Sequence, residues 1–276
     1  MQPIRDNLQE HAGEIIPYKD GPDRIVCEVA GGIAEVYCDI SPDKPDDNQD
    51  SVLVMQLDAD TAVLAVADGA GGIAGGRRAS RLTLATLRDV VGEAHAAGQS
   101  LRDAMISAIE HANASVMVET RGAATTLTAM TIDNRDVRVF HVGDSVALIT
   151  GQRTAVKLQT VAHSPVGFAI AAGFLTEEQA IYHPERHIVS NFIGTPEMVI
   201  EVGAPLRLAK RDTVLIASDG LTDNLHMSEI LAMMRRGSLD ASLDDIVTLA
   251  QARMQRISQH APGKADDLSV IMFRKP

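Results

Sequence analysis

Short apolar runs recur along the chain, and glycine, asparagine or acidic residues close most of them, a pattern that predicts β-strands. The first two runs lie either side of Gly31 and Gly32, which predicts a β-hairpin with its turn at these glycines. The next two lie either side of the segment 58–60 and predict a second hairpin. The predicted strands cover residues 24–30, 33–40, 52–57, 61–67, 124–132, 136–142, 146–150, 213–217 and 268–273.

Longer segments carry apolar residues at a helical period and predict helices between the groups of strands. Ser100 is a suitable N-cap residue for one of them, because its hydroxyl can accept a hydrogen bond from an unpaired backbone N–H of the first turn. The predicted helices cover residues 77–97, a segment that begins at Ser100, and residues 227–236 and 243–259. This order of elements predicts an α+β fold in which helices pack on antiparallel sheets.

A single folded domain is expected over residues 24–276, because neither a low-complexity linker nor an internal repeat interrupts the pattern. Residues 1–23 are polar and interrupted by proline, which predicts an extended or partly disordered lead-in. Between residues 163 and 200 the pattern loosens into short helical or irregular pieces with several histidines. We expect a mobile subdomain there.

Composition narrows the range of partners. The 276 residues carry a formal net charge of −12 and no tryptophan, which argues against nucleic acid or an anionic membrane as the ligand. The N-terminal residues lack the apolar core of a signal peptide, and the longest apolar stretch, residues 166–175, is far shorter than a membrane span. We therefore expect a cytoplasmic protein.

Carboxylates stand at the ends of several predicted strands. Asp68, Asp144 and Asp219 each follow an apolar run. Asp50 and the pair Asp266–Asp267 each precede one. Acidic residues at both ends of several strands predict one carboxylate cluster at a sheet edge, and divalent cations would offset the repulsion within such a cluster.

The residue types in this cluster indicate the chemistry that it can support. Mg²⁺ and Mn²⁺ prefer oxygen ligands, and two such ions about 4 Å apart can activate a bridging water and hold a phosphoryl group for in-line attack. The chain has no set of cysteines and histidines with zinc spacing and no Gly-x-Ser-x-Gly nucleophile motif. The acids therefore favour metal-assisted hydrolysis of a phosphate ester.

The glycine-rich segment 69–74 allows a second interpretation, because it fits the G-x-G-x-x-A pattern of a dinucleotide-binding loop between a strand and a helix. Two features oppose this interpretation. Asp68 would place a negative charge near the pyrophosphate, and a second helix follows the first where a strand ending in an acid would be needed. Nucleotide binding is the weaker alternative.

Five short motifs follow one another along the chain. They are Asn48-Gln49-Asp50-Ser51, Asp68-Gly69-x-Gly71-Gly72, Gly143-Asp144-Ser145, Ser218-Asp219-Gly220-Leu221-x-Asp223 and Asp266-Asp267-Leu268-Ser269. In this order and spacing they resemble the metal-dependent protein phosphatases, the PPM family or protein phosphatase type 2C. The similarity runs from about residue 24 to 274, and part of the segment 163–200 resembles the family's flap subdomain.

The resemblance implies a four-layer αββα sandwich with metal ions in the cleft between two antiparallel sheets. By position, Asp68 would bridge two Mn²⁺ or Mg²⁺ ions, and the Gly69 carbonyl would bind one of them. Asp219 and Asp266 would complete this centre, and Asp50 would bind it directly or through water.

The resemblance also implies a third, weaker metal site and a substrate class. Asp144 and Asp223, with Asp219 shared, match the third site of bacterial members. A water activated by the two metals would attack phosphorus directly, without a phospho-enzyme intermediate. The substrates would be proteins phosphorylated on serine or threonine by an opposing kinase.

Several positions depart from the family pattern. Pro45 stands in place of an arginine that grips the substrate phosphate, and the neighbouring Lys44 is our candidate contact, although an ammonium cannot reproduce the planar grip of arginine. Val146 replaces a second arginine, and Ala70 replaces a histidine assigned as the general acid in animal members. Asp267 replaces the usual asparagine and is expected to shape a turn or support the ligands.

These departures leave a second function open. The chain would then be a weakly active or inactive phosphatase-like module that binds phosphopeptides. The intact set of acids argues against it, because clustered carboxylates repel one another and a pure binding module does not need them.

Overall fold

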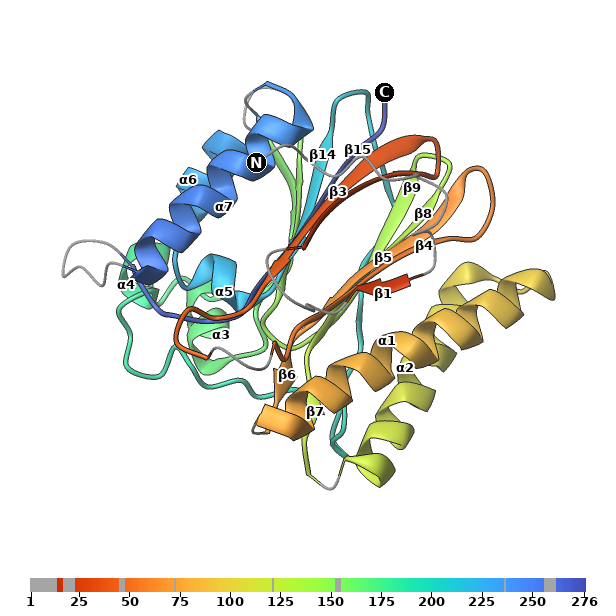
Figure 1. Cartoon of the computed structure of the whole chain (residues 1–276), viewed down its shortest axis with the longest axis horizontal. Coiled ribbons are helices and arrows are strands. Elements are labelled where there is room, and N and C mark those ends of the chain that lie inside the picture. The colour runs from red at the N-terminus through yellow and green to blue at the C-terminus, as the bar shows by residue number, and fades with distance from the viewer. Residues whose placement is uncertain are drawn as a thin grey trace.

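The computed structural model describes residues 14–16, 23–44, 48–71, 73–120, 122–151, 155–235, 237–255 and 262–276. In this part of the chain two antiparallel sheets face each other, and helices cover both outer faces (Figure 1). The resulting four layers are the αββα sandwich that the family resemblance implies.

The first sheet has the strand order β1–β4–β5–β8–β9–β12, and β13 also pairs with β9. Its strands are β1 (Glu14–Ile16), β4 (Ser51–Gln56), β5 (Thr61–Ala67), β8 (Leu127–Asp133), β9 (Asp136–Val142), β12 (Glu201–Val202) and β13 (Leu206–Arg207). A short separate pair, β6 (Gly69–Ala70) with β7 (Ala124–Thr125), continues from the ends of this sheet.

The second sheet has the strand order β11–β10–β14–β15–β3–β2. Its strands are β2 (Asp23–Val29), β3 (Gly32–Asp39), β10 (Val146–Thr150), β11 (Val156–Gln159), β14 (Thr213–Ala217) and β15 (Leu268–Arg274). β15 lies between β3 and β14, although it comes last along the chain.

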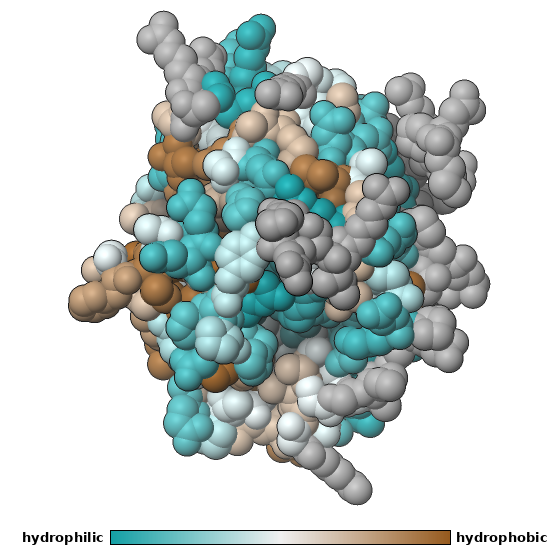
Figure 2. All heavy atoms as spheres, turned by 90° about the vertical axis from the view of Figure 1, so that its left-hand side faces the viewer, coloured by the Kyte–Doolittle hydropathy of each residue, from teal (hydrophilic) through white to brown (hydrophobic). Residues whose placement is uncertain are grey.

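Helices α1 and α2 cover the first sheet, whereas α6 and α7 cover the second (Figure 1). Three further described helices lie near one end of the sandwich (Figure 1). The bounds are α1 (Ile73–Ala96), α2 (Leu101–Glu119), α3 (Pro165–Ala171), α4 (Glu177–Ala180), α5 (Asp219–Thr222), α6 (Met227–Met233) and α7 (Leu239–Gln255). On the face shown in Figure 2, hydrophilic side chains predominate and hydrophobic ones form small scattered groups.

Buried apolar side chains fill the three spaces between the four layers. One cluster of these side chains lies between the two sheets. A second lies between the first sheet and helices α1 and α2, and a third lies between the second sheet and helices α6 and α7. Buried members, in that order, are Val36, Leu64 and Phe273, then Leu87, Met105 and Phe140, then Leu215, Leu243 and Ile246. The strand ends that carry the acids are therefore fixed by packing on both faces of each sheet.

The first hairpin turns one residue earlier than predicted. Ala30 and Gly31 form the turn, with φ angles of 49° and 67°, and Val29 pairs with Gly32. Positive φ at both central positions matches the twist of the flanking strands. The prediction of a turn at Gly31 and Gly32 was wrong, because Ala30 adopts a conformation that sequence patterns assign to glycine.

Other differences concern short or irregular elements. The strand predicted at 124–132 is two strands, because the Thr126 N–H leaves the ladder and donates to the Asp68 carbonyl at 2.8 Å. Residues 14–16 of the predicted lead-in are extended and pair with β4. The helix predicted from 243 begins at Leu239, and residues 256–259 of that prediction lie outside the described residues. The segment 163–200 contains α3, α4 and irregular chain, as predicted.

The fold removes the nucleotide alternative. Every strand pair in the described part of the chain is antiparallel, whereas a dinucleotide fold needs parallel strands joined through a helix. Among the described helices, none combines the length and apolar character needed to cross a bilayer.

We predict that Phe273→Ala lowers the free energy of unfolding by about 3–5 kcal/mol, because it leaves a cavity between the sheets. Phe273 is completely buried there, whereas Phe174 is 84% exposed. Phe174→Ala is the matched control and should change stability by less than about 0.5 kcal/mol. Urea denaturation measures both values, and equal effects would contradict this account of the core.

Candidate metal centre

The predicted acids meet at one edge of the sandwich. Asp68 follows β5 and Asp144 follows β9 in the first sheet, while Asp219 follows β14 and Asp266 precedes β15 in the second. All four line one cavity of about 210 Å³. Its remaining lining residues are Gly69, Ala70, Thr126, His187, Val189 and Phe192. The cavity thus lies where strand ends of both sheets converge.

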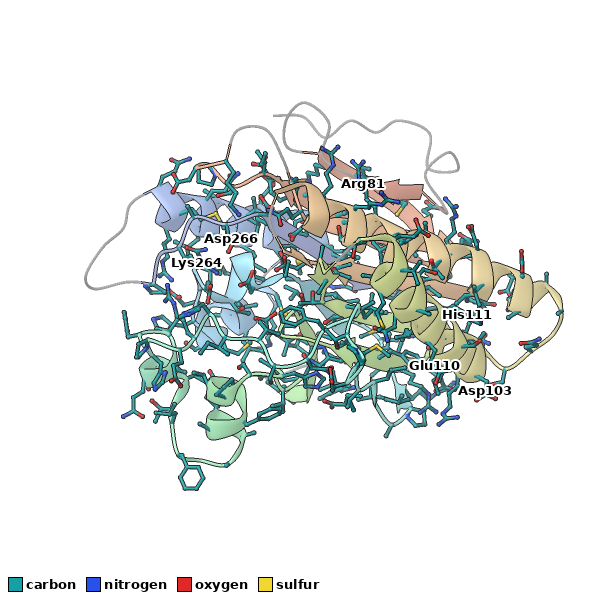
Figure 3. All side chains as sticks on the ribbon, turned by 90° about the horizontal axis from the view of Figure 1, so that it is seen from below. Arg81, Asp103, Glu110, His111, Lys264 and Asp266 are labelled. Carbon is teal, nitrogen blue, oxygen red and sulfur yellow. The ribbon has the colours of Figure 1, made fainter. Side chains whose placement is uncertain are left out.

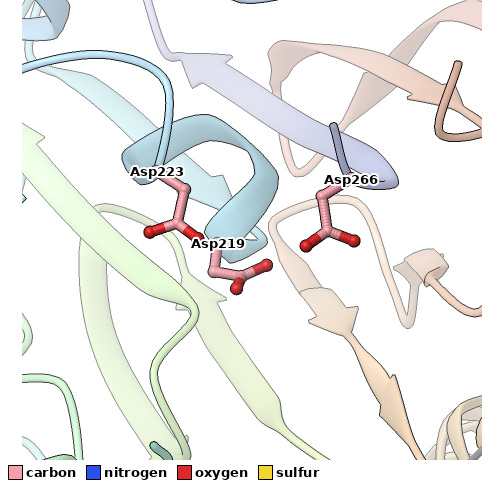
Figure 4. A group of neighbouring side chains, drawn as sticks. All are labelled: Asp219, Asp223 and Asp266. Carbon is pink, nitrogen blue, oxygen red and sulfur yellow. The ribbon is translucent and has the colours of Figure 1, made fainter. Parts of the chain in front are cut away.

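Asp219, Asp223 and Asp266 form the tightest group (Figure 4). One carboxylate oxygen from each lies within 4.8 Å of the others. Asp219 begins α5 and Asp223 caps it, so the spacing of four residues places both carboxylates on the same side of the helix. Gly220 lets α5 approach the chain before β15, because a Cβ atom there would lie 1.9 Å from the Asp267 carbonyl oxygen.

The backbone around Asp68 is clamped. The Asp68 N–H donates to Thr126 Oγ1 at 3.0 Å, and Thr125 Oγ1 donates to the Asp68 carbonyl at 2.8 Å. The next residue, Gly69, passes so close to α1 that a Cβ atom would lie 2.2 Å from the Gly76 carbonyl oxygen. Only glycine fits this position, and the contact fixes the direction in which Asp68 enters the cavity.

Asp50 is 2% exposed and is not among the residues that line this cavity. Its Oδ2 accepts a hydrogen bond of 2.7 Å from Ser218 Oγ, which in turn accepts one of 3.1 Å from the Ser269 N–H. Ser218 therefore connects an acid of the first sheet to the second sheet. Its role was not predicted, although its place directly before Asp219 in the motif was a usable signal.

Asp267 is 4% exposed and binds backbone. Its two carboxylate oxygens accept hydrogen bonds of 2.8 Å from the N–H groups of Ser41 and Gln49. It therefore fastens the loop before β4 to the start of β15. This geometry agrees with the supporting role predicted from the sequence.

Burial raises the pKa values of Asp68, Asp50 and Asp144. The pKa of Asp68 is well above its usual range, because the group is buried and lies near Asp50, Asp219 and Asp144. The pKa of Asp50 is also raised, by burial and by Asp267. Burial, followed by Asp219 and Asp223, raises the pKa of Asp144 to about 8. These raised pKa values indicate that negative charge at these three acids is unfavourable without a cation.

Lys264 supplies part of this charge, and the sequence prediction missed it. Its ammonium contacts Asp219, Asp223 and Asp266. Burial alone would lower the pKa of Lys264, but these carboxylates together raise it. A basic residue two positions before a candidate ligand was the available signal.

The departures from the family pattern have different structural outcomes. Lys44 lies at the cluster, with Nζ 3.9 Å from Asp266 Oδ1 and 43% of its side chain exposed. Pro45 lies outside the described residues. Val146 is buried in the apolar layer under α6 and α7, and Ala70 lines the cavity. Lys44, the candidate phosphate contact predicted from the sequence, therefore lies beside an acid of the cluster.

Two histidines support the turn that carries Asp144. His163 Nδ1 accepts a hydrogen bond from the Gly143 N–H at 3.1 Å. His141 lies beside it, with Nδ1 2.9 Å from Thr128 Oγ1. His187 differs, because it lines the cavity with the acids.

A larger cavity of about 340 Å³ adjoins this one and shares Asp144 and Asp219 with it. Residues of α3 and α4 form one wall, and residues near α5 and α6 form another. Asp223 lines this cavity as well. The segment 163–200 therefore borders the acids directly.

The donors fit hard divalent cations. Carboxylates and the Gly69 carbonyl supply oxygen ligands, which suit Mg²⁺ and Mn²⁺ better than the thiolate and imidazole sets of structural zinc sites. The raised pKa of Asp68 and the Lys264 ammonium that contacts Asp266 show that this site attracts positive charge. Fold and donors together define an αββα sandwich with a candidate metal centre.

Comparison with known proteins assigns the family. The family model described as protein phosphatase 2C matches residues 43–257, and the chain belongs to this family of serine/threonine protein phosphatases. A 2C-type relative from Streptococcus pyogenes is 30% identical over 76% of this chain and 88% of its own length.

Two solved structures show the same fold. The serine/threonine phosphatase of Streptococcus agalactiae has a TM-score of 0.72 and 28% identity, covering 88% of this chain and 100% of its own. The catalytic domain of the serine/threonine phosphatase PstP was solved with two manganese ions. It has a TM-score of 0.66 and 24% identity, covering 87% of this chain and 96% of its own.

We predict that the metal-free protein loses stability as pH rises from about 4 through 8. Asp144, with a folded pKa of about 8, keeps a proton that the unfolded chain has released above its usual pKa of about 3.9. The melting temperature in EDTA should therefore fall between pH 5 and pH 8. Saturating Mn²⁺ should raise it most at pH 8, where metal displaces the fewest protons.

Asp144→Asn is the control for this prediction, because it removes one of the groups with a raised pKa. Its melting temperature in EDTA should depend less steeply on pH than that of the unmodified protein. A melting temperature that is constant or increases over this range would contradict the assigned direction of the shift.

Proposed function

We propose that this chain removes phosphate from serine and threonine in proteins, using two Mn²⁺ or Mg²⁺ ions held by its acid cluster. The observation that carries the proposal is the oxygen-donor cavity between the two sheets of a protein phosphatase 2C family member. The choice of ions follows from the donor type. The two manganese ions of the PstP domain agree with it.

Asp68, Asp219, Asp266 and the Gly69 carbonyl would hold the two ions. When bound, the ions would lower the pKa of a water and offset the charge of the phosphoryl oxygens. Asp50 would act directly on this centre or through water. Ser218 holds one Asp50 oxygen by a hydrogen bond and so orients the other.

Asp144 and Asp223, together with Asp219, would form a third and weaker site. Asp144 stands on the turn that His163 braces, and Asp223 stands at the end of α5. Both border the larger cavity beside the segment 163–200. An ion held by these acids would therefore border that segment, which resembles the family's flap.

Lys44 would contact the substrate phosphate from the exposed rim of the cluster. Its ammonium is a point charge at 3.9 Å from Asp266, so it would attract a phosphate without fixing its orientation. The ions would then determine orientation. Weaker substrate binding than in relatives with arginine follows from this difference.

The cellular setting completes the proposal. We infer a single phosphatase domain over residues 24–276, with a mobile flap at about 163–200, acting in the cytoplasm. Its substrates would be phosphoproteins that a serine/threonine kinase modifies. The negative charge of the chain agrees with metal-assisted binding of an anionic substrate.

The central test is hydrolysis of a phosphothreonine peptide with Mn²⁺, with EDTA and with Asp68→Asn. We expect EDTA to abolish turnover and Asp68→Asn to lower kcat/KM at least about 100-fold, since even partners of metal ligands contribute about 10–100-fold. Asp103→Asn is the matched control, because Asp103 lies on α2, far from Asp266 (Figure 3). Metal-independent turnover, or peptide binding without turnover in the Mn²⁺-loaded protein, would refute the proposal.

A second test addresses Lys44. Lys44→Met should raise KM for the phosphopeptide by about three- to ten-fold, because an exposed ion pair contributes roughly 1 kcal/mol and 1.4 kcal/mol corresponds to a factor of ten. Lys44→Arg should keep KM at the value of the unmodified protein or lower it. The kcat value should change little in both variants. An unchanged KM for Lys44→Met would exclude Lys44 as a phosphate contact.

A further inference from the structure

A lysine ammonium occupies the space between three of the acids. Lys264 Nζ lies 2.7 Å from Asp223, 2.8 Å from Asp266 and 3.2 Å from Asp219. Figure 3 labels Lys264 and Asp266 side by side, and Figure 4 shows the three carboxylates directed toward a common space. An ammonium has three N–H donors, so each carboxylate can accept one of them.

The backbone of Lys264 is anchored to the helix that carries two of these acids. The side chain of Asn224, which is completely buried, accepts the Lys264 N–H at 2.9 Å and donates to the Lys264 carbonyl at 2.8 Å. The same amide donates to the Gly220 carbonyl in α5 at 2.8 Å. Arg253 holds the Asn224 carbonyl at 2.8 Å. Lys264 is therefore positioned by a buried hydrogen-bond network, in contrast to a lysine on a surface loop.

The Lys264 ammonium occupies a position that would suit a metal ion. The oxygens that Asp219, Asp223 and Asp266 contribute lie within 4.8 Å of one another, close enough to share one cation. Two of these residues, Asp219 and Asp223, belong to the proposed third metal site. The charge of Lys264 also acts on the remaining member of that site, because it lowers the pKa of Asp144 against the effect of the neighbouring acids.

We propose that Lys264 is a tethered cation that replaces the third metal ion of this centre. Its ammonium offsets the repulsion among Asp219, Asp223 and Asp266 without metal, and it competes with any ion that enters between them. The chain then binds two ions tightly and a further ion only weakly. This inference rests on the proposed two-ion centre.

The test is Mn²⁺ binding by calorimetry and by native mass spectrometry, without substrate. We expect two ions on the unmodified protein and a third on Lys264→Met, with an affinity for that third ion at least about ten-fold higher. Lys264→Arg keeps the charge and should retain two ions. Adding Asp223→Asn to Lys264→Met should abolish the gain, since it removes a carboxylate from the position that the ammonium vacates.

A second readout is the stability of the metal-free protein. Lys264→Met should lower the melting temperature in EDTA by several degrees, because it leaves the carboxylates without their cation. Mn²⁺ should restore it. Lys44→Met is the control for general charge loss, because Lys44 approaches a single carboxylate of this group at 3.9 Å, and it should produce neither the third ion nor the restored stability.

An unchanged ion count and affinity in Lys264→Met would overturn the proposal, and so would equal effects of Lys264→Met and Lys44→Met. Should Lys264→Met fail to fold in EDTA, Lys264→Gln loaded with Mn²⁺ provides the same comparison of ion count. Absence of phosphopeptide hydrolysis with two ions bound would overturn the proposed function alone, because the ion measurements do not depend on turnover.

Discussion

Repulsion among carboxylates is the constraint on which the rest of this structure depends. Both sheets contribute acids to one edge, and burial there makes each negative charge more unfavourable for its neighbours. Packing on both faces of each sheet holds the acids together against this repulsion. Cations must then offset it, and Lys264 is the cation that the chain itself provides. Binding of the proposed metal ions would therefore be coupled to folding at this edge.

Much of the site could be predicted because its signals are local. Asp68 follows a continuous buried strand, and Asp219 and Asp223 share a motif of a few residues. Ser218 and Lys264 could not be assigned in the same way, because their roles depend on contacts across the fold. The Ser218 hydroxyl meets Asp50 across a separation of 168 residues, and Lys264 lies in an irregular segment without periodicity. Tertiary hydrogen bonds of this kind leave no pattern in neighbouring residues.

The same distinction between local signals and long-range contacts explains which elements of the fold could be predicted. The long strands and α1, α2 and α7 follow from apolar periodicity, which reports burial on one or both faces. The turn at Ala30 and the break between β7 and β8 do not, because each depends on a single residue whose backbone adopts an unexpected conformation or partner. Strands as short as β12 and β13 contain too few residues for alternation to appear.

The position of β15 has a consequence for synthesis of the protein. This strand lies in the middle of the second sheet, between β3 and β14, and Asp266 and Asp267 directly precede it. During synthesis, β3 cannot pair with β15 until residue 274 has left the ribosome. The edge of β3 that pairs with β15 stays exposed to chaperones until then. The acid cluster is complete only when that strand inserts. The proposed activity, which depends on Asp266, would therefore begin only after this strand is in place.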